Sequence, residues 1–143
     1  MKKTILIAVM LFAFSGSQLF AQSVLEKYDS ETIYLSTYKY YKKGGSHRIG
    51  LMAKNLKKEM AISPNAMIEF GKYEKKQKQA ILFWSAGILT FASSYLIDKE
   101  KEELRASMQL AGVVMFYVSF PLQLKATKHL NKSVWVRNRD VLK

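Results

Sequence analysis

The chain has 143 residues, enough for one domain or one small membrane protein. It has no cysteine, which excludes disulfides, thiolate nucleophiles and cysteine-ligated metals. Its 23 basic and 11 acidic side chains give a net charge of +12, which favours an anionic partner or a basic surface beside a membrane.

The first 21 residues have the order of a secretory signal peptide. Lys2 and Lys3 precede an apolar run from Ile5 to Phe14, and small and polar residues come next. This run is about half as long as the roughly 20 residues that a bilayer requires. We expect cleavage after Ala21, with cleavage after Ser17 or an uncleaved anchor as alternatives. The rest of the chain is then exported.

Residues 22–79 predict a basic α+β segment outside the membrane. The stretch ETIYLSTYKYYKKGGSHRIG is rich in β-forming residues around Gly44 and Gly45, which is typical of a β-hairpin. Ser63 is the expected N-cap and Pro64 the first residue of a long helix that runs toward Asp98. Between them, RIGLMAKNLKKEM predicts an amphipathic helix. Its apolar face would be Ile49, Met52, Ala53, Leu56 and Met60.

Two uncharged runs predict an antiparallel helical hairpin over residues 80–124. Residues 80–97 and 106–124 hold 18 and 19 residues without a charge. As helices they would be about 27–29 Å long, close to the ~30 Å hydrocarbon core of a bilayer. The short charged link 98–105 forces the two helices to run antiparallel. We expect both to span a membrane. The alternative is the core of a soluble bundle, which their serine and threonine content would suit.

Small residues predict where the two helices touch, because small side chains at four-residue spacing let backbones approach closely in lipid. Small residues are also common in such helices, which is the alternative explanation of the pattern. The candidate packing residues are Ala86, Gly87, Thr90, Ser93, Ser94, Ser107, Ala111, Gly112 and Ser119.

Lysines flank the hairpin on the side away from the link, partly in the basic C-terminal tail 125–143. By hairpin geometry both groups lie at one membrane face, as a basic belt. We expect this belt to fix helix depth by snorkelling. Alternatively, it attracts anionic lipid headgroups at about 1 kcal/mol per basic residue. The belt residues are Lys72, Lys75, Lys76, Lys78, Lys125, Lys128 and Lys132.

Two rules disagree on which side of the membrane the link faces. Residues 22–79 carry a net charge of +6, the tail +5 and the link −1. The tendency of Lys and Arg to stay in the cytoplasm places the link outside. An N-terminal signal exports the segment directly after it and therefore places the link in the cytoplasm. We give the signal priority, because it acts first, and predict an inner-membrane protein whose N-terminal segment and tail are periplasmic.

No pattern predicts a catalytic, cofactor or metal site. His47 and His129 are the only histidines and lie far apart in the sequence, and no phosphate-binding glycine loop is present. The stretch YKYYKK could stack on single-stranded nucleic acid, but an exported segment rarely meets it. We expect no enzyme activity, no cofactor and no nucleic-acid partner. An enzyme would need a site built from Glu59, Glu69 or Tyr73.

Four stretches, YYKKGG, SPNAMIEFGKYEKKQK, SFPLQL and KHLNKSVWVRN, carry a resemblance to known proteins. They resemble a group of small envelope proteins of Bacteroidetes-type bacteria that has no assigned activity. The resemblance implies a signal peptide, a helical hairpin ending in proline and a basic tail.

The sequence as a whole predicts a mainly α protein, with a signal peptide, a short β-hairpin, an amphipathic helix and a two-helix hairpin. The function that we expect is a non-enzymatic, interacting or structural protein of the bacterial envelope. Its partners would be the lipid bilayer and either another protein or a second copy. The alternative is an exported soluble helical module that binds an apolar, lipid-like ligand.

Overall fold

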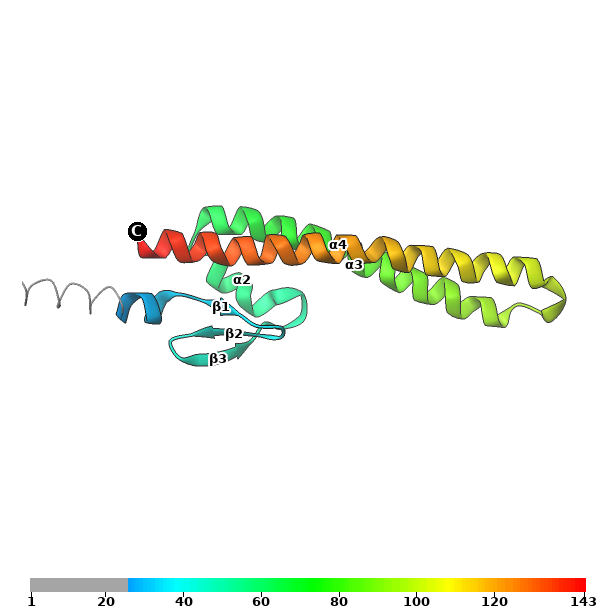
Figure 1. Ribbon diagram of the computed structural model, residues 1–143, viewed down its shortest axis with the longest axis horizontal. Helices are drawn as coiled ribbons and strands as arrows, with labels where there is room; N and C mark the ends of the chain where they lie inside the picture. The colour runs from blue at the N-terminus through cyan, green and yellow to red at the C-terminus, as the bar shows by residue number, and fades with distance from the viewer. Residues whose placement is uncertain (1–25) are drawn as a thin grey trace, which may run out of the picture.

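The computed structural model describes residues 26–143, so the predicted signal peptide and its cleavage sites lie outside the described residues. The described part is an elongated rod (Figure 1). Two long antiparallel helices, α3 (Pro64–Ser93) and α4 (Glu102–Leu142), form its length. A small sheet and a short helix, α2, lie against one end. The predicted mainly α fold is confirmed.

The sheet has three antiparallel strands, where the sequence predicts two. β1 (Tyr34–Leu35), β2 (Lys39–Lys42) and β3 (Gly45–Arg48) pair in sequence order, after a helical segment at residues 26–31. The predicted hairpin is β2–β3. Its turn residues are Lys43 and Gly44, with φ of 53° and 70°, whereas Gly45 already belongs to β3. Two left-handed residues in a two-residue loop are the form that hairpins prefer.

The amphipathic helix is shorter than predicted. A 3₁₀ turn at Leu51–Ala53 precedes α2, which spans Lys54–Met60. Gly50, Met52 and Ala53 have left-handed φ of 77°, 51° and 55°. The conformation costs a non-glycine residue about 1–2 kcal/mol. The chain therefore bends sharply before α2 begins, and the predicted helix start at this point is wrong.

The start of α3 is confirmed. Ser63 caps the helix: its Oγ accepts a hydrogen bond from the backbone N–H of Ala66 at 3.1 Å, and Pro64 occupies the first helical position. The same hydroxyl donates to Asp140 Oδ2 at 2.6 Å, near the end of α4. One serine therefore both caps α3 and ties it to the opposite helix.

The connection between the long helices is shorter than the predicted link 98–105. A 3₁₀ turn at Ser94–Leu96 ends α3, and a second at Lys99–Lys101 leads directly into α4. Residues 102–105 therefore belong to α4, where Glu102 and Glu103 face the positive end of the helix dipole.

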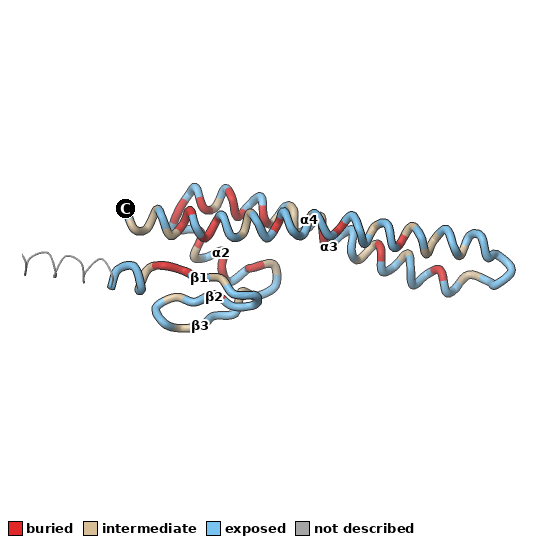
Figure 2. The backbone as a smooth tube through the Cα atoms, in the orientation of Figure 1, coloured by how far each residue is buried: buried red, intermediate tan, exposed pale blue. Residues whose placement is uncertain are grey.

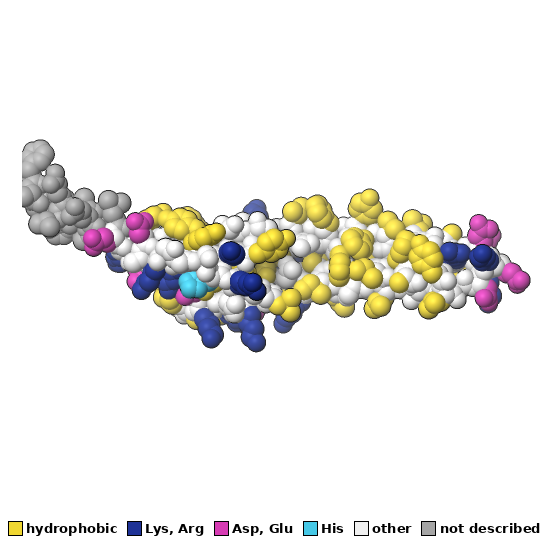
Figure 3. Space-filling model, turned by 90° about the horizontal axis from the view of Figure 1, so that it is seen from below, with side chains coloured by type: hydrophobic (Ala, Val, Ile, Leu, Met, Phe, Trp, Pro, Cys, Tyr) yellow, Lys and Arg dark blue, Asp and Glu magenta, His cyan; other side chains and the backbone are white. Residues whose placement is uncertain are grey.

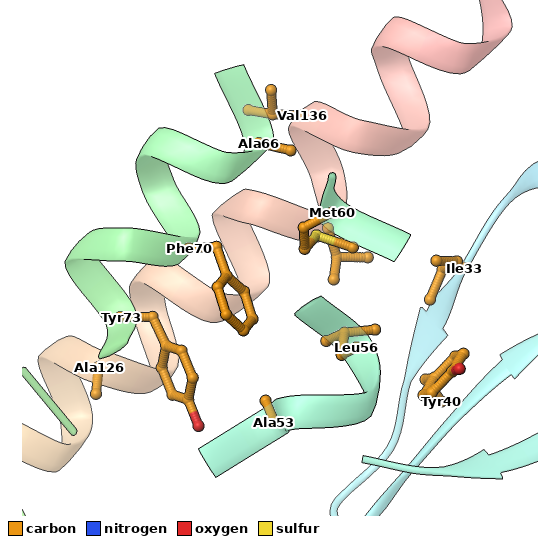
Figure 4. Packing of buried hydrophobic residues seen from close by; sticks show 11 residues of the cluster. Ile33, Tyr40, Ala53, Leu56, Met60, Ala66, Phe70, Tyr73, Ala126 and Val136 are labelled. Carbon is orange, nitrogen blue, oxygen red and sulfur yellow. The ribbon is translucent and has the colours of Figure 1, made fainter. Parts of the chain in front are cut away.

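The predicted basic tail 125–143 is not a separate segment. Helix α4 runs without interruption through Pro121 to Leu142, so these residues are its last part. They also supply part of the main hydrophobic core, between the two long helices, α2 and the sheet (Figure 4). This core comprises Ile33, Tyr40, Ala53, Leu56, Met60, Ala66, Phe70, Tyr73, Ala126, Val134 and Val136. We call this half of the molecule the α+β layer: residues 26–79 together with residues 125–142 of α4.

Two neighbouring residues of α4 tie the first strand to the last helix. The Asn138 side chain accepts from the backbone N–H of Ile33 at 2.9 Å and donates to the Ile33 carbonyl at 2.8 Å. Arg137 is fully buried, donates to the Glu31 carbonyl and lies 3.5 Å from Glu59. Burial lowers the pKa of Arg137. The two ends of the described chain are thus bound to each other.

Candidate functional site

The two long helices touch along a line of buried residues that recurs every seven positions. Along α3 and the 3₁₀ turn that follows it, the line is Ala66, Tyr73, Ala80, Gly87 and Ser94, and on α4 it is Gly112, Ser119, Ala126 and Ser133. A seven-residue period keeps one face of each helix toward its partner when the pair winds into a left-handed supercoil. Apart from Tyr73, every member is small, so the backbones come close together.

The closest approach is between Gly87 and Gly112. A Cβ added to either glycine would lie 2.8 Å from the carbonyl oxygen of the other. Nearby, the hydroxyls of Ser94 and Ser119 donate to carbonyls of their own helices, Phe91 at 2.6 Å and Phe116 at 2.7 Å. The buried hydroxyls are satisfied locally, so the contact between the helices rests on backbone packing.

The predicted packing residues therefore divide into two groups. Gly87, Ser94, Gly112 and Ser119 lie on the contact line and are buried. The half-buried residues Ala86, Thr90 and Ala111 flank it, whereas Ser93 and Ser107 are exposed and lie away from it. The prediction from four-residue spacing included residues outside the contact, because the contact between the helices repeats every seven residues.

The outer surface of the hairpin is apolar. Between residues 80 and 124 the buried positions are Ala80, Gly87, Ser94, Gly112 and Ser119, all on the contact line (Figure 2). Large apolar side chains are exposed around both helices, and many of them are seen along this half of the rod on the face that Figure 3 shows. They include Leu82, Trp84, Leu89, Leu110, Val114, Tyr117, Phe120 and Leu124. Two helices in the described chain, Pro64–Leu96 and Lys99–Leu142, are long and apolar enough to span a membrane.

An apolar cleft of about 640 Å³ opens beside the glycine contact. Gly87 and Gly112 line it where the helices meet. The other lining residues are Ile88, Phe91, Ala92, Val113, Phe116, Tyr117 and Phe120. The volume is within the roughly 300–1,000 Å³ of ordinary ligand sites. The side chains of the lining are apolar apart from the Tyr117 hydroxyl, so the cleft is suited to an acyl chain or another helix.

Charged residues occupy both ends of the apolar half. The far tip carries Asp98, Glu100, Glu102 and Glu103 among its lysines, and these acidic side chains gather there in Figure 3. The predicted basic belt lies at the other end, because α3 and α4 run antiparallel with Gly87 beside Gly112. Lys75, Lys78, Lys125 and Lys128 are exposed there.

Two members of the belt meet at a buried carboxylate that the sequence did not single out as their partner. Glu69 Oε1 accepts from Lys72 at 2.8 Å and from Lys132 at 3.2 Å, and His129 Nδ1 lies 2.8 Å from Oε2. These partners hold the pKa of Glu69 at about 2, with the Lys72 hydrogen bond the largest cause. The cluster joins α3 to α4 and leaves neither carboxylate oxygen free to act as a base.

The other residues considered for catalysis are also engaged in structure. Glu59 pairs with Lys42 at 2.7 Å, and Tyr73 is buried in the core, where burial raises the pKa of its hydroxyl. His47 stacks on Tyr40 with ring centroids 5.1 Å apart. Within residues 26–143, no three His, Asp or Glu side chains are grouped so as to hold a metal ion.

No family model, curated protein or solved structure matches the chain.

Proposed function

We propose that the chain is an integral membrane protein of the bacterial envelope with a structural or interacting role and no catalytic activity. One observation carries the proposal: large apolar side chains are exposed on all sides of both helices between the basic belt and the acidic tip. A bilayer is the solvent in which such a surface costs nothing to expose.

Burial favours a membrane over a soluble core. A monomeric soluble protein rarely exposes an apolar patch larger than a few hundred Å². Core helices of soluble proteins are mostly buried, whereas only 17% and 11% of the most apolar 18-residue windows of α3 and α4 are buried. Residues 26–143 do not supply the missing cover, and lipid would cover every side at once.

The fold and the predicted signal peptide together favour one orientation, although the charge bias favours the other. The N-terminal segment and the end of α4 pack together, so both lie at the same membrane face, and the link 98–103 lies at the other. We infer that the α+β layer is periplasmic and that the link is cytoplasmic, because a signal peptide exports the segment directly after it.

Extraction tests membrane insertion directly. Membranes from cells producing the full chain are washed with alkaline carbonate, with high salt, and with a mild detergent. We expect the protein to stay in the pellet after both aqueous washes and to dissolve only in detergent. Release by carbonate would contradict integral insertion. Release by salt alone would show that the protein is held to the membrane only by electrostatic attraction between the basic belt and the lipid headgroups.

The apolar cleft favours a second candidate, an exported soluble module that binds a lipid-like molecule. Its lining, with Phe91 and Phe116 on opposite helices, suits an acyl chain. In that case most of the hairpin would have to be covered by further copies of the chain. Purification without detergent as a single monodisperse species would favour this candidate over the first.

A further inference from the structure

Two loops of the α+β layer lie at the end of the sheet that is nearer to the apolar half of the rod. One joins β1 to β2 at residues 36–38, and the other leads from β3 into α2 at residues 49–53. The backbone N–H of Ile49 donates to the Tyr38 carbonyl at 3.1 Å, so the loops are adjacent. Figure 1 shows both on the side toward which α3 extends, with the β2–β3 turn at the opposite end of the sheet.

Each loop exposes one large apolar or aromatic side chain. Tyr38 is 81% exposed and Leu51 is 88% exposed, although the core of the layer is close by. The exposure of Leu51 is built into the backbone, since Gly50, Met52 and Ala53 around it all have positive φ. Ala53 is buried by the same bend that leaves Leu51 outside.

The loops lie at the level where the long helices change from charged to apolar. Ala53 packs in the core with Tyr73 of α3 and Ala126 of α4 (Figure 4). Ala126 lies two positions after Leu124, the last residue of the uncharged run. Tyr73 precedes Ala80, the first residue of the other run, by about 10 Å of helix.

Basic side chains surround the two exposed residues. Lys39 is the residue after Tyr38 and pairs in register with Arg48 of β3, and Lys54 begins α2 just after the second loop. All three are exposed. An apolar tip with basic neighbours suits an anionic lipid surface, where the tip enters the headgroup region and the cations bind phosphate. Tyrosine is also favoured at this depth.

We propose that Tyr38 and Leu51 form a second membrane contact, which inserts into the headgroup region of an anionic bilayer and holds the α+β layer against it. The inference rests on the proposed membrane insertion of the hairpin. Lipid is the occupant because the two tips lie at the level of the long helices where the bilayer would end, with exposed basic side chains beside them. A protein partner would need no such alignment.

The test uses single cysteines in the full chain, which has none of its own. Leu51→Cys and, separately, Tyr38→Cys are labelled with an environment-sensitive fluorophore. The labelled protein is reconstituted in vesicles of phosphatidylcholine and phosphatidylglycerol, with or without lipids that carry a nitroxide at the headgroup or shallow in the chain. Because both side chains are exposed, the substitutions disturb packing little. Lys43→Cys, in the turn at the far end of the sheet, is the matched control.

We expect blue-shifted emission and nitroxide quenching at positions 51 and 38, and neither at position 43. A fourth site, Leu89→Cys in the middle of the uncharged run 80–97, reports on insertion of the hairpin itself with a deep nitroxide. Quenching at 89 without quenching at 51 and 38 would overturn the second contact and leave the proposed function standing. Absence of deep quenching at 89 would overturn the proposed function instead.

Discussion

At the scale of single residues, Glu69 is a buried carboxylate with three charged or titratable partners. It is nearly buried and holds Lys72, Lys132 and His129 at once, from both long helices. Its folded-state pKa of about 2 is below its usual value of 4.5. The stability that it contributes is therefore complete above about pH 4.5 and is lost as pH falls toward 2.

Glu69→Gln should remove that contribution. Charge-assisted hydrogen bonds with partly exposed lysines are worth about 1–2 kcal/mol together, so the variant should unfold at lower temperature at pH 7. It should also lose less stability than the parent between pH 4.5 and 2. Thermal unfolding in detergent across this range measures both effects. Glu74→Gln, which breaks a more exposed pair with Lys57, is the control and should change little. Equal acid sensitivity of the Glu69→Gln variant and the parent would contradict the assignment.

Gly87 provides a test of the helix contact. In Gly87→Ala the new Cβ would lie 2.8 Å from the Gly112 carbonyl oxygen, so α3 and α4 have to move apart. Overpacking of this kind costs about 1–3 kcal/mol. Gly71→Ala is the matched control on the same helix, since nothing lies within 4 Å of its Cβ. It should instead stabilise by about 0.5–1 kcal/mol through helix propensity. Opposite changes in unfolding temperature are expected, and a stabilised Gly87→Ala would refute the close approach.

At the scale of elements, the start of α3 depends on one buried hydroxyl. Ser63→Ala removes both the cap on Ala66 and the hydrogen bond to Asp140. A lost cap alone costs about 0.5–2 kcal/mol, and loss of the hydrogen bond to the half-buried Asp140 adds to it. Ser30→Ala removes an exposed serine that bonds only to a local carbonyl, and serves as the comparison. Chemical denaturation should separate the two variants clearly. If the two variants have the same free energy of unfolding, the Ser63 cap contributes nothing to stability.

The elements that could be predicted from the sequence are those with local causes. The Ser63–Pro64 start depends on adjacent residues, and the hairpin turn depends on Gly44. The sharp bend at Met52 and Ala53 could not be predicted, because it is held by packing of Ala53 in a core that distant segments build. Strand β1 has two residues and no pattern of its own.

The contact face of the hairpin was only partly predictable, for a geometric reason. In a straight helix the same face returns after three or four residues. A search for small residues at that spacing therefore includes Ser93 and Ser107 among the contact residues as readily as their neighbours. Supercoiling lowers the effective period to about 3.5 residues, so the same face returns every seven. The spacing Ala80, Gly87, Ser94 was therefore present in the sequence, and it excludes the two exposed serines.

At the scale of the whole molecule, the two ends of the described chain lie together and the acidic tip lies alone. If the hairpin spans the membrane, this arrangement places both flanks at one face and the tip at the other, and cysteine labelling tests which face is periplasmic. With Glu102→Cys at the tip and Asn131→Cys on an exposed face of α4, a thiol reagent that cannot cross membranes should label 131 and spare 102 in outer-membrane-permeabilised cells. The reverse pattern would restore the orientation that the charge bias favours.

The charge bias also predicts which changes weaken this topology. The flanks carry net charges of +6 and +5 and the tip −1, opposite to the usual excess of Lys and Arg in the cytoplasm. Lys99→Glu with Lys101→Glu should lower the fraction of molecules with a cytoplasmic tip. Replacing Glu100, Glu102 and Glu103 with Lys should raise that fraction. The fraction is measured by labelling at position 131, and no response to either change would show that charge does not steer insertion.

The hydrogen bonds between Asn138 and Ile33 join residues that are 105 positions apart, so Asn138 is synthesised long after Ile33. The layer cannot complete its core until the segment after the second apolar run has been synthesised and has come to the same side as the strands. Until then, residues 26–79 lack Ala126, Val134 and Val136 and expose the apolar face that these side chains cover. If the hairpin spans a membrane, as we propose, a chain with only one run inserted would leave that face open to proteases and chaperones. Completion of the core of the α+β layer would then depend on insertion of both runs.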